Sequence, residues 1–299
     1  MEIEVTPKKV YKFCSFNNPI DRSLLENLEI TFDSPEIWID FNECEFDFDF
    51  GKESEHRKNL EKCLYFERER EPLQFYDKLI KKFIFNDISY HNKETKELIN
   101  ILTDILIKEQ NSGDGYQFRF DAVRNNYFKR TGVFCTSIYN DKLPLWMDFA
   151  NFGEGYCIGL DNEVLHKWSI ENSLNYAGKM INYYDISNKP KLRLSCSLNS
   201  EDLEAMINVV ISLPNKRLWH ESEYRYINIF QEELNKECLK RRVKIPKESI
   251  TDIIIGYKSS IENEKELLSF KNNFISTKFH KTYFTNQFKD EGEIFVVAY

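Results

Sequence analysis

The chain has 299 residues, of which 41% are hydrophobic and 15% aromatic, and its formal net charge is −8. This length and apolar content are sufficient to bury a substantial core in one large domain or two small ones. A net negative charge argues against non-specific nucleic-acid binding, because such binding depends on lysine and arginine side chains that neutralise phosphates. The seven cysteines are odd in number and never spaced as C-x-x-C, so neither a disulfide framework nor a zinc knuckle is indicated.

The N-terminal sequence and the hydropathy pattern predict the compartment. The first residues, MEIEVTPKKVYKF, lack the apolar stretch of a signal peptide. The sequence also has no apolar run of about 18 residues, the length that a membrane-spanning helix needs. We therefore expect a cytoplasmic protein with reduced cysteines and no membrane partner.

The N-terminal part of the chain predicts short strands around one helix. Strands are expected at Val10–Phe16 and at Ile30–Phe32, and a short helix with its N-cap at or near Asp21 is expected between them. The stretch EFDFDF at residues 45–50 alternates strictly, which places its acidic side chains on one face and its phenylalanines on the other. We interpret it as an amphipathic edge strand or loop with a solvated acidic face, and a metal site is the alternative.

The remainder of the chain predicts a mixed sheet with an insertion. From about residue 52 to residue 130 the sequence is charged and favours helices. After Thr131 we expect strands at residues 132–137, 155–161, 219–230, 250–255 and 294–298, and helices at residues 143–150, 203–213 and 262–272. The predicted fold class is therefore α+β, in which a single domain at residues 1–299 has a mixed β-sheet core and a mainly helical insertion at about 52–130.

Several familiar enzyme signatures are absent from the sequence. There is no G-x-x-x-x-G-K-S/T, no H-E-x-x-H and no G-x-S-x-G, and the glycines from Gly153 onward do not have the spacing of the dinucleotide fingerprint. The motifs of P-loop, zinc-protease, α/β-hydrolase and Rossmann dinucleotide sites are therefore not found.

The segment LWHESEYRY, residues 218–226, places several charges at the edge of a predicted core. In a strand, Glu221, Glu223 and Arg225 would share one face with Trp219, and His220 would lie on the other face. The two carboxylates would repel each other, and the arginine would partly neutralise them. The residues alone leave two interpretations open: a salt-bridged strand end, or a pair of functional carboxylates.

Segments along most of the chain resemble a bacterial family known as domain of unknown function 2971. The segments that carry this resemblance are VYKFCSF, ITFDSPEIWIDFNECEFDF, GVFCTSIYNDKLPLWMDFANFGEGYCIGLD, WHESEYRY and ITDIIIGYKSS, in that order. Because the family name assigns no activity, this resemblance implies no function.

The order of the motifs is also similar to that of ADP-ribosyltransferases. An early strand carries an aromatic and a basic residue, a middle strand ends in two hydroxyls, and a late strand carries Glu-x-Glu. The matching residues in this chain are Tyr11, Lys12, Thr136, Ser137, Glu221 and Glu223. The resemblance implies an ADP-ribosyltransferase-like fold with NAD as the substrate. It also implies that the early residues hold the NAD pyrophosphate or ribose, the hydroxyls brace the nicotinamide side, and Glu223 bonds the nicotinamide ribose.

The chemistry of ADP-ribosyl transfer requires these residue types. Cleavage of the glycosidic bond of NAD generates an oxocarbenium-like cation, which a carboxylate such as that of Glu223 stabilises. Glu221 would orient or deprotonate the acceptor, and Arg225 completes the predicted catalytic set. An aromatic slot for nicotinamide is expected from Trp146, Tyr183 or Phe152. The expected acceptor is a protein or a nucleic acid, the expected role is that of a toxin or a phage-defence effector, and an antitoxin or regulatory protein is a possible partner.

Two other functions remain open on the sequence. The first is a metal-dependent nuclease, in which acidic residues such as Glu43, Glu45, Asp47 and Glu221 would hold Mg²⁺. The second is a non-catalytic binding or sensor module of a stress or defence system, in which Glu221, Glu223 and Arg225 form a structural ion-pair network. Metal dependence would favour the nuclease, and release of nicotinamide from NAD would favour the transferase.

Overall fold

The computed structural model describes residues 6–35, 47–49, 53–54, 57, 60, 95–110, 128–172, 178–185, 188–193, 207–214, 221–230, 241–285 and 293–299. Contacts within the chain form two compact units. The first, which we call the main unit, comprises Met1–Asp40, Lys129–Tyr183 and Leu213–Tyr299, and the second unit comprises Phe41–Phe128 and Tyr184–Ser212. Whether the chain is one domain with an insertion, as the sequence suggests, stays a prediction.

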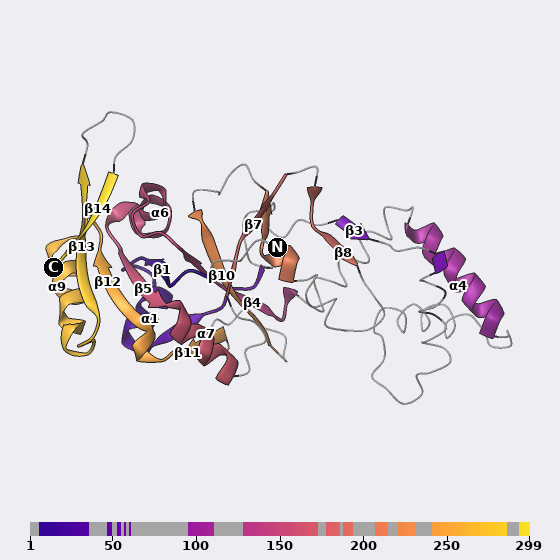
Figure 1. Ribbon diagram of the computed structural model, residues 1–299, viewed down its shortest axis with the longest axis horizontal. Helices are drawn as coiled ribbons and strands as arrows, with labels where there is room; N and C mark the ends of the chain where they lie inside the picture. The colour runs from indigo at the N-terminus through magenta and orange to yellow at the C-terminus, as the bar shows by residue number, and fades with distance from the viewer. Residues whose placement is uncertain are drawn as a thin grey trace. The chain divides into compact units, whose positions relative to one another are not determined.

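An eight-stranded mixed sheet is the centre of the described part of the main unit (Figure 1), with the strand order β14-β13-β12-β5-β1-β4-β10-β6. Its neighbouring strands pair antiparallel, except that β12 and β13 run parallel. The strands are β1 (Lys9–Cys14), β4 (Thr131–Ser137), β5 (Tyr156–Asp161), β6 (Lys179–Met180), β10 (Glu223–Ile229), β12 (Ile250–Ile255), β13 (Lys278–Thr285) and β14 (Glu293–Ala298). This mixed sheet, together with the helices around it, confirms the predicted α+β class.

Strand β4 changes its neighbour along its length. On one side β10 pairs with every residue of β4. On the other side β1 pairs with β4 only where Tyr11 faces Ser137. Further along, Asp33 takes the place of β1 and exchanges two backbone hydrogen bonds of 2.8 Å with Val133. Strand β1 therefore diverges from β4, and the segment that follows β2 (Glu29–Thr31) lies beside β4 instead.

One face of the sheet is covered by α1 (Pro19–Glu26), α7 (Asn162–Glu171) and α9 (Ile261–Ser269), and we call it the α1 face. Its apolar core joins strand residues to helix residues, including Val10, Phe134, Ile158, Ile253, Phe279, Leu24, Leu25, Leu165 and Leu267. All of these side chains are at most 5% exposed, so the burial of their apolar surface stabilises this side of the sheet.

The opposite face is covered in part by α6 (Leu143–Phe149), and we call it the α6 face. Phe13, Cys157 and Ile254 of the sheet pack there against Leu145 and Trp146. This apolar cover lies over β1, β5 and β12, whereas the part of the α6 face formed by β4 and β10 carries the polar side chains described below.

Side-chain caps determine where the helices of the α1 face begin. Asn18 Oδ1 accepts a hydrogen bond of 3.0 Å from the Ile20 backbone N–H, and Pro19 occupies the first turn of α1. The N-cap is therefore Asn18, three residues before Asp21, and the Asp21 carboxylate instead accepts from the Ser15 backbone N–H at 2.8 Å. Asp161 caps α7 in the same way as Asn18 caps α1.

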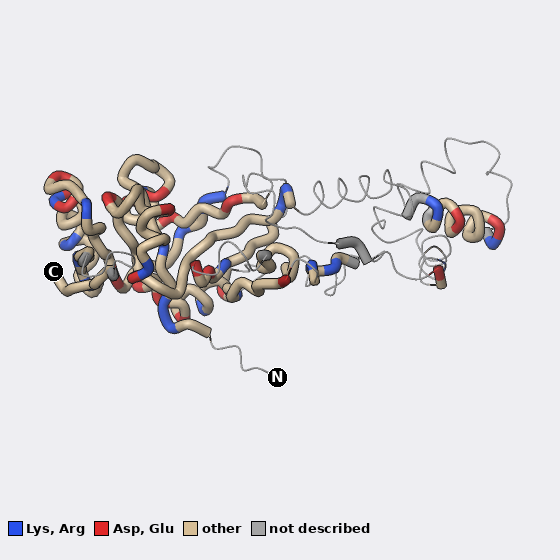
Figure 2. Tube along the Cα trace, turned by 90° about the horizontal axis from the view of Figure 1, so that it is seen from above, with Lys and Arg blue, Asp and Glu red and all other residues tan. Residues whose placement is uncertain are grey.

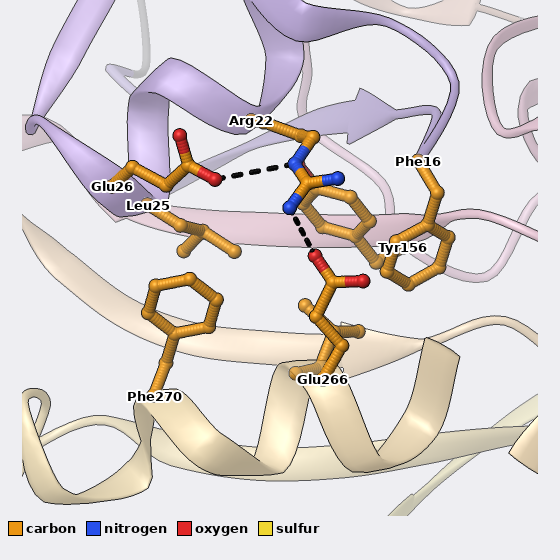
Figure 3. A pocket seen from close by; sticks show the side chains of 8 residues that line it. Phe16, Arg22, Leu25, Glu26, Tyr156, Glu266 and Phe270 are labelled. Atoms are coloured by element: carbon orange, nitrogen blue, oxygen red, sulfur yellow. Dashed lines mark hydrogen bonds and ion pairs between the residues drawn. The ribbon is translucent and has the colours of Figure 1, made fainter. Parts of the chain in front are cut away.

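Helices α1 and α9 are joined by an arginine at the rim of a small niche (Figure 3). Arg22 donates to Glu26 at 3.2 Å within α1 and pairs with Glu266 of α9 at 2.5 Å. The niche has a volume of about 10 Å³, and its other lining residues are Phe16, Leu25, Tyr156, Leu267 and Phe270. A space of this size holds no more than about one water molecule, so we do not regard it as a ligand site.

Short elements complete the description. In the second unit, β3 (Asp47–Asp49) pairs in parallel with β8 (Lys191–Arg193), and α4 (Thr95–Gln110) falls in the range of the predicted insertion. Acidic and basic residues are interspersed along α4 (Figure 2), and no continuous basic stripe follows this helix. Elsewhere β2 pairs with β11 (Arg242–Lys244), and β7 (Asn182–Tyr184) pairs with β9 (Ser212–Pro214). Most residues between 52 and 130, where the helical insertion is predicted, lie outside the described ranges.

The close contact between the backbone just before β5 and the end of β1 can be tested by substituting Gly155. A Cβ atom on this residue would lie 2.2 Å from the backbone oxygen of Cys14, which cannot rotate away. We expect Gly155→Ala to lower the free energy of unfolding by about 1–3 kcal/mol, measured by urea denaturation. An unchanged midpoint for Gly155→Ala would contradict the described backbone approach.

Candidate functional site

Three residues from distant parts of the chain form a row across the α6 face. Tyr11 on β1 pairs with Ser137 on β4, and Ser137 pairs with Glu223 on β10. Directly paired residues of antiparallel strands have their side chains on the same face, with Cβ atoms about 4.5–5.5 Å apart. The Tyr11–Ser137–Glu223 row therefore contains one residue from each of the three predicted motifs.

The two hydroxyl groups of this row differ in their surroundings. Burial, reinforced by the charge of Asp252, raises the pKa of Tyr11 to about 12. The phenol therefore stays protonated at neutral pH and remains a hydrogen-bond donor. Ser137 is buried, and its Oγ donates to the backbone oxygen of Glu221 at 2.6 Å. The serine hydroxyl thus ties β4 to the chain just before β10.

Glu223 forms a buried ion pair with Arg225. The guanidinium donates to Glu223 Oε2 at 2.8 Å, and the two residues are only 6% and 1% exposed. Cys135 lies opposite Arg225 in the register, and burial together with the charge of Glu223 raises the pKa of its thiol well above the usual value. Cys135 is therefore a protonated thiol at neutral pH rather than a nucleophilic thiolate.

Strand β10 begins later than the sequence predicts. It starts at Glu223, because Ser222 has a φ of 42° in the left-handed region and interrupts the extended backbone. The predicted sharing of one strand face by Glu221 and Glu223 is therefore wrong, although Glu221 is also buried. Trp219 and His220 lie outside the described residues.

Tyr183 lies close to these carboxylates. Burial, together with the charges of Glu223 and Glu221, raises the pKa of Tyr183 to about 12, while a hydrogen bond with the Glu223 backbone acts in the opposite direction. The structure thus brings the predicted residues Tyr183, Glu221, Glu223 and Arg225 together. The phenol of Tyr183 is half-buried and protonated at neutral pH.

Lys12 and Thr136 are directed to the opposite side of the sheet. Each is adjacent in sequence to a member of the row, and neighbouring residues of a strand point to opposite faces. Thr136 Oγ1 donates to the Tyr224 backbone oxygen at 2.7 Å, and the Lys12 ammonium lies 5.4 Å from the centre of the Phe134 ring. The predicted NAD-binding set is therefore divided between the two faces.

Trp146 is part of the apolar core of the α6 face. Its side chain is fully buried, and its ring meets that of Phe13 edge-on at a centroid distance of 5.2 Å. Its Nε1–H donates to the Asn140 backbone oxygen at 2.8 Å, so its polar atom is satisfied within the protein. In this structure the indole presents no free ring face to a ligand.

A polar cluster around Asp252 was not predicted from the sequence. The Asp252 carboxylate, on the α6 face, contacts Lys9 Nζ at 2.6 Å, Thr251 Oγ1 at 2.7 Å and His280 Nε2 at 2.9 Å. Burial opposes its ionisation, but the hydrogen bonds from these three groups outweigh burial and lower the pKa of Asp252. Gly159 leaves room for this carboxylate beside Tyr11. His280 reaches Asp252 because β12 and β13 pair in parallel, and no local pattern in the sequence indicates that pairing.

The search for metal and membrane sites covers only the described residues. Among them, no group of three or more His, Cys, Asp or Glu side chains is arranged to hold a metal ion. Of the acidic residues considered for Mg²⁺, Glu43 and Glu45 lie outside the described ranges. No helix in the described part of the chain has the length and hydropathy required to span a membrane.

Comparisons with protein-family models, with curated proteins and with solved structures find no match to this chain. The resemblances to the domain of unknown function 2971 family and to ADP-ribosyltransferases therefore stay predictions.

The coupling between Glu223 and Arg225 can be measured by a double-mutant cycle. Glu223→Gln or Arg225→Met alone leaves the other charge buried without its partner, so each should lower the free energy of unfolding by about 3–5 kcal/mol. The double variant should lose clearly less than the sum, as measured by urea denaturation. Glu26→Gln is the control, because its partner Arg22 is exposed and the expected loss is below about 1 kcal/mol. Additive losses at residues 223 and 225 would contradict the coupling.

The contribution of Asp252 to stability should depend on pH. Its folded pKa is lower than its unfolded pKa of about 3.9. The ionised carboxylate therefore stabilises the fold above that value, and the contribution is lost as the pH falls through the folded pKa. We expect the urea midpoint of the wild type to fall more steeply than that of Asp252→Asn between about pH 5 and pH 3, with the variant less stable at pH 7. Parallel pH profiles for the two proteins would disprove this role of Asp252.

Proposed function

We propose that this protein is an NAD-dependent ADP-ribosyltransferase whose NAD site lies on the α6 face, along the Tyr11–Ser137–Glu223 row. The observation that carries the proposal is the register: residues 11, 137 and 223 are direct neighbours on three strands. They belong to the early, middle and late motifs on which the resemblance to ADP-ribosyltransferases rests. Tyr183 and Glu221 lie near the Glu223 end of the row.

The reaction begins with the bond between C1 of the nicotinamide ribose and the pyridinium nitrogen. When this bond breaks, its electron pair leaves with neutral nicotinamide, and the ribose carbon becomes cationic. A carboxylate beside that carbon stabilises the charge as it develops, which is the role we assign to Glu223. An oxygen or nitrogen atom of the acceptor then bonds to the carbon and loses its proton to a base, for which Glu221 is the candidate.

The neighbours of Glu223 support this assignment. Arg225 is two residues further along β10 and holds one carboxylate oxygen at 2.8 Å, so the carboxylate has a defined orientation. Tyr11 is a protonated donor at the other end of the row, suited to a phosphate or ribose oxygen of NAD. Arg225 is a positioning residue in this scheme, because it acts through Glu223.

The acceptor that we propose is a macromolecule, either a protein or a nucleic acid, and the role is that of a toxin or phage-defence effector. An antitoxin or regulatory protein would be the natural partner of such an activity. We place this activity in the cytoplasm, where NAD and such acceptors are present.

A non-catalytic binding or sensor module is the second candidate. The observation that favours it is the low exposure of Glu223 and Arg225, because a buried and mutually satisfied pair is also a common structural element. A metal-dependent nuclease has less support, since the described residues contain no suitable metal-binding group.

The transferase proposal predicts that the purified chain releases nicotinamide from NAD when incubated with cell lysate, and that labelled ADP-ribose appears on a macromolecule. Glu223→Gln should lower nicotinamide release by about a hundredfold or more, because the cation loses its carboxylate. Nicotinamide is measured by chromatography and the transferred label by gel electrophoresis. Glu26→Gln, the same substitution at an exposed carboxylate of α1, should retain full activity.

Folding must be separated from chemistry in this experiment. Glu223→Gln leaves Arg225 uncompensated, so the Glu223→Gln/Arg225→Met double variant is assayed as well, with circular dichroism for both. The proposal predicts that the double variant is folded and inactive. A folded wild-type chain that neither releases nicotinamide nor transfers label would refute the transferase. Nuclease activity that EDTA abolishes would then support the nuclease, and the absence of both activities would support the binding module.

A further inference from the structure

A cavity of about 140 Å³ lies on the α1 face, where β1 diverges from β4. Lys12 of β1 and Phe134 of β4 line it on the sheet side, and Thr31 and Asp33 line it from the segment that replaces β1 beside β4. The other lining residues are Cys14, Asn18, Ile20, Asp21, Leu24, Glu29 and Ile30. The cavity is thus a consequence of the change of neighbour along β4.

Two charged groups and one hydroxyl of this cavity have no hydrogen bond or ion pair within the described part of the chain, although the Lys12 ammonium lies over the Phe134 ring. None of the hydrogen bonds or ion pairs found there uses the Lys12 ammonium or the Asp33 carboxylate. The Thr31 hydroxyl is buried without a hydrogen-bond partner, and Thr31 is only 7% exposed. Lys12 and Asp33 are only partly buried, so water can reach both groups, and together they offer two opposite charges to a ligand in the cavity.

The other acidic residues of the cavity are already engaged. Asp21 accepts a hydrogen bond from the Ser15 backbone, and Glu29 accepts one from the Ser23 hydroxyl at 2.9 Å. Lys12 and Asp33 are therefore the two charged groups of the cavity for which no hydrogen bond or ion pair is found within the described part of the chain.

Lys12 and Asp33 affect each other without forming an ion pair. Burial lowers the pKa of Lys12, but neighbouring groups that include Asp21 and Asp33 outweigh it, so the ammonium stays charged. Burial raises the pKa of Asp33, and the charge of Lys12 opposes that shift. Two opposite charges that line one cavity and remain apart can both be satisfied by a ligand that carries one charge of each sign.

We propose that this cavity binds a small zwitterion of the α-amino-acid class. Its carboxylate would contact the Lys12 ammonium, and its ammonium would contact the Asp33 carboxylate. Phe134 and Leu24 provide apolar surface for a side chain. This site contains none of the Tyr11–Ser137–Glu223 row, so it does not depend on the proposed transferase function.

The size and charge of the cavity exclude other ligand classes. A volume of about 140 Å³ corresponds to four or five water molecules at roughly 30 Å³ each. Sites for drug-sized molecules and cofactors have volumes of about 300–1,000 Å³, so a dinucleotide does not fit. A multiply charged anion would be repelled by the carboxylates of Asp21, Glu29 and Asp33.

The proposal is tested by titrating the standard free α-amino acids into the full-length protein, with isothermal calorimetry and thermal denaturation as readouts. We expect at least one of them to bind and to raise the melting temperature. Its N-acetyl derivative lacks the positive charge and its methyl ester lacks the negative charge, so each should bind at least about tenfold more weakly. Lys12→Met and Asp33→Asn should each weaken binding of the free amino acid by a similar factor.

Two control variants locate the site. Lys8→Met makes the same substitution at an exposed residue just before β1, and Glu26→Gln removes an exposed carboxylate of α1; neither should change the affinity. If Lys12→Met fails to fold, Asp33→Asn and the two derivatives on the wild type decide the question. The proposal is overturned if no free amino acid binds at millimolar concentration, if both derivatives bind as well as the free form, or if binding survives unchanged in the folded cavity variants.

Discussion

The hydrogen bonding of β4 is the constraint on which both sites depend. A strand has only two edges, and β4 gives one of them entirely to β10 while it divides the other between β1 and Asp33. The short contact with β1 sets the register that aligns residues 11, 137 and 223 on the α6 face. The divergence of β1 beyond that contact opens the cavity on the α1 face.

The buried pair of Glu223 and Arg225 combines two requirements that normally conflict. A carboxylate that stabilises a cation must be ionised and oriented, yet a lone buried charge is costly. The guanidinium at 2.8 Å meets both conditions, because it compensates the charge and fixes one oxygen. The same contact also makes the site resemble an ordinary structural ion pair, so the chemistry has to be decided by assay.

The sequence predicts well those elements whose periodicity is strong. Strand β12 appears where its isoleucines before Gly256 predict a buried strand, and helix α6 begins where the proline of its first turn predicts it. Strand β13 was not predicted, because basic residues interrupt its apolar pattern. Its parallel partner β12 is also separated from it in the sequence by helix α9. Parallel pairing of this kind leaves no local mark in the sequence.

The candidate site shows where such prediction fails. That Tyr11 and Lys12 lie on opposite faces follows from strand alternation alone, but the resemblance to ADP-ribosyltransferases led us to group them in one pocket. The kink at Ser222 could not be foreseen, because a serine with positive φ has no distinctive local pattern. The contact between Asp252 and His280 likewise depends on long-range register rather than on sequence spacing.

The single residue pair between β1 and β4 has a mechanical consequence. The large sheet consists of two groups of strands, β14-β13-β12-β5-β1 and β4-β10-β6. Direct strand pairing joins the two groups only between Tyr11 and Ser137. Because this junction between β1 and β4 has so few hydrogen bonds, it is the part of the sheet where the strands separate at the lowest free energy. A ligand that bound beside Lys12 would lie next to this junction, on the face opposite the Tyr11–Ser137–Glu223 row.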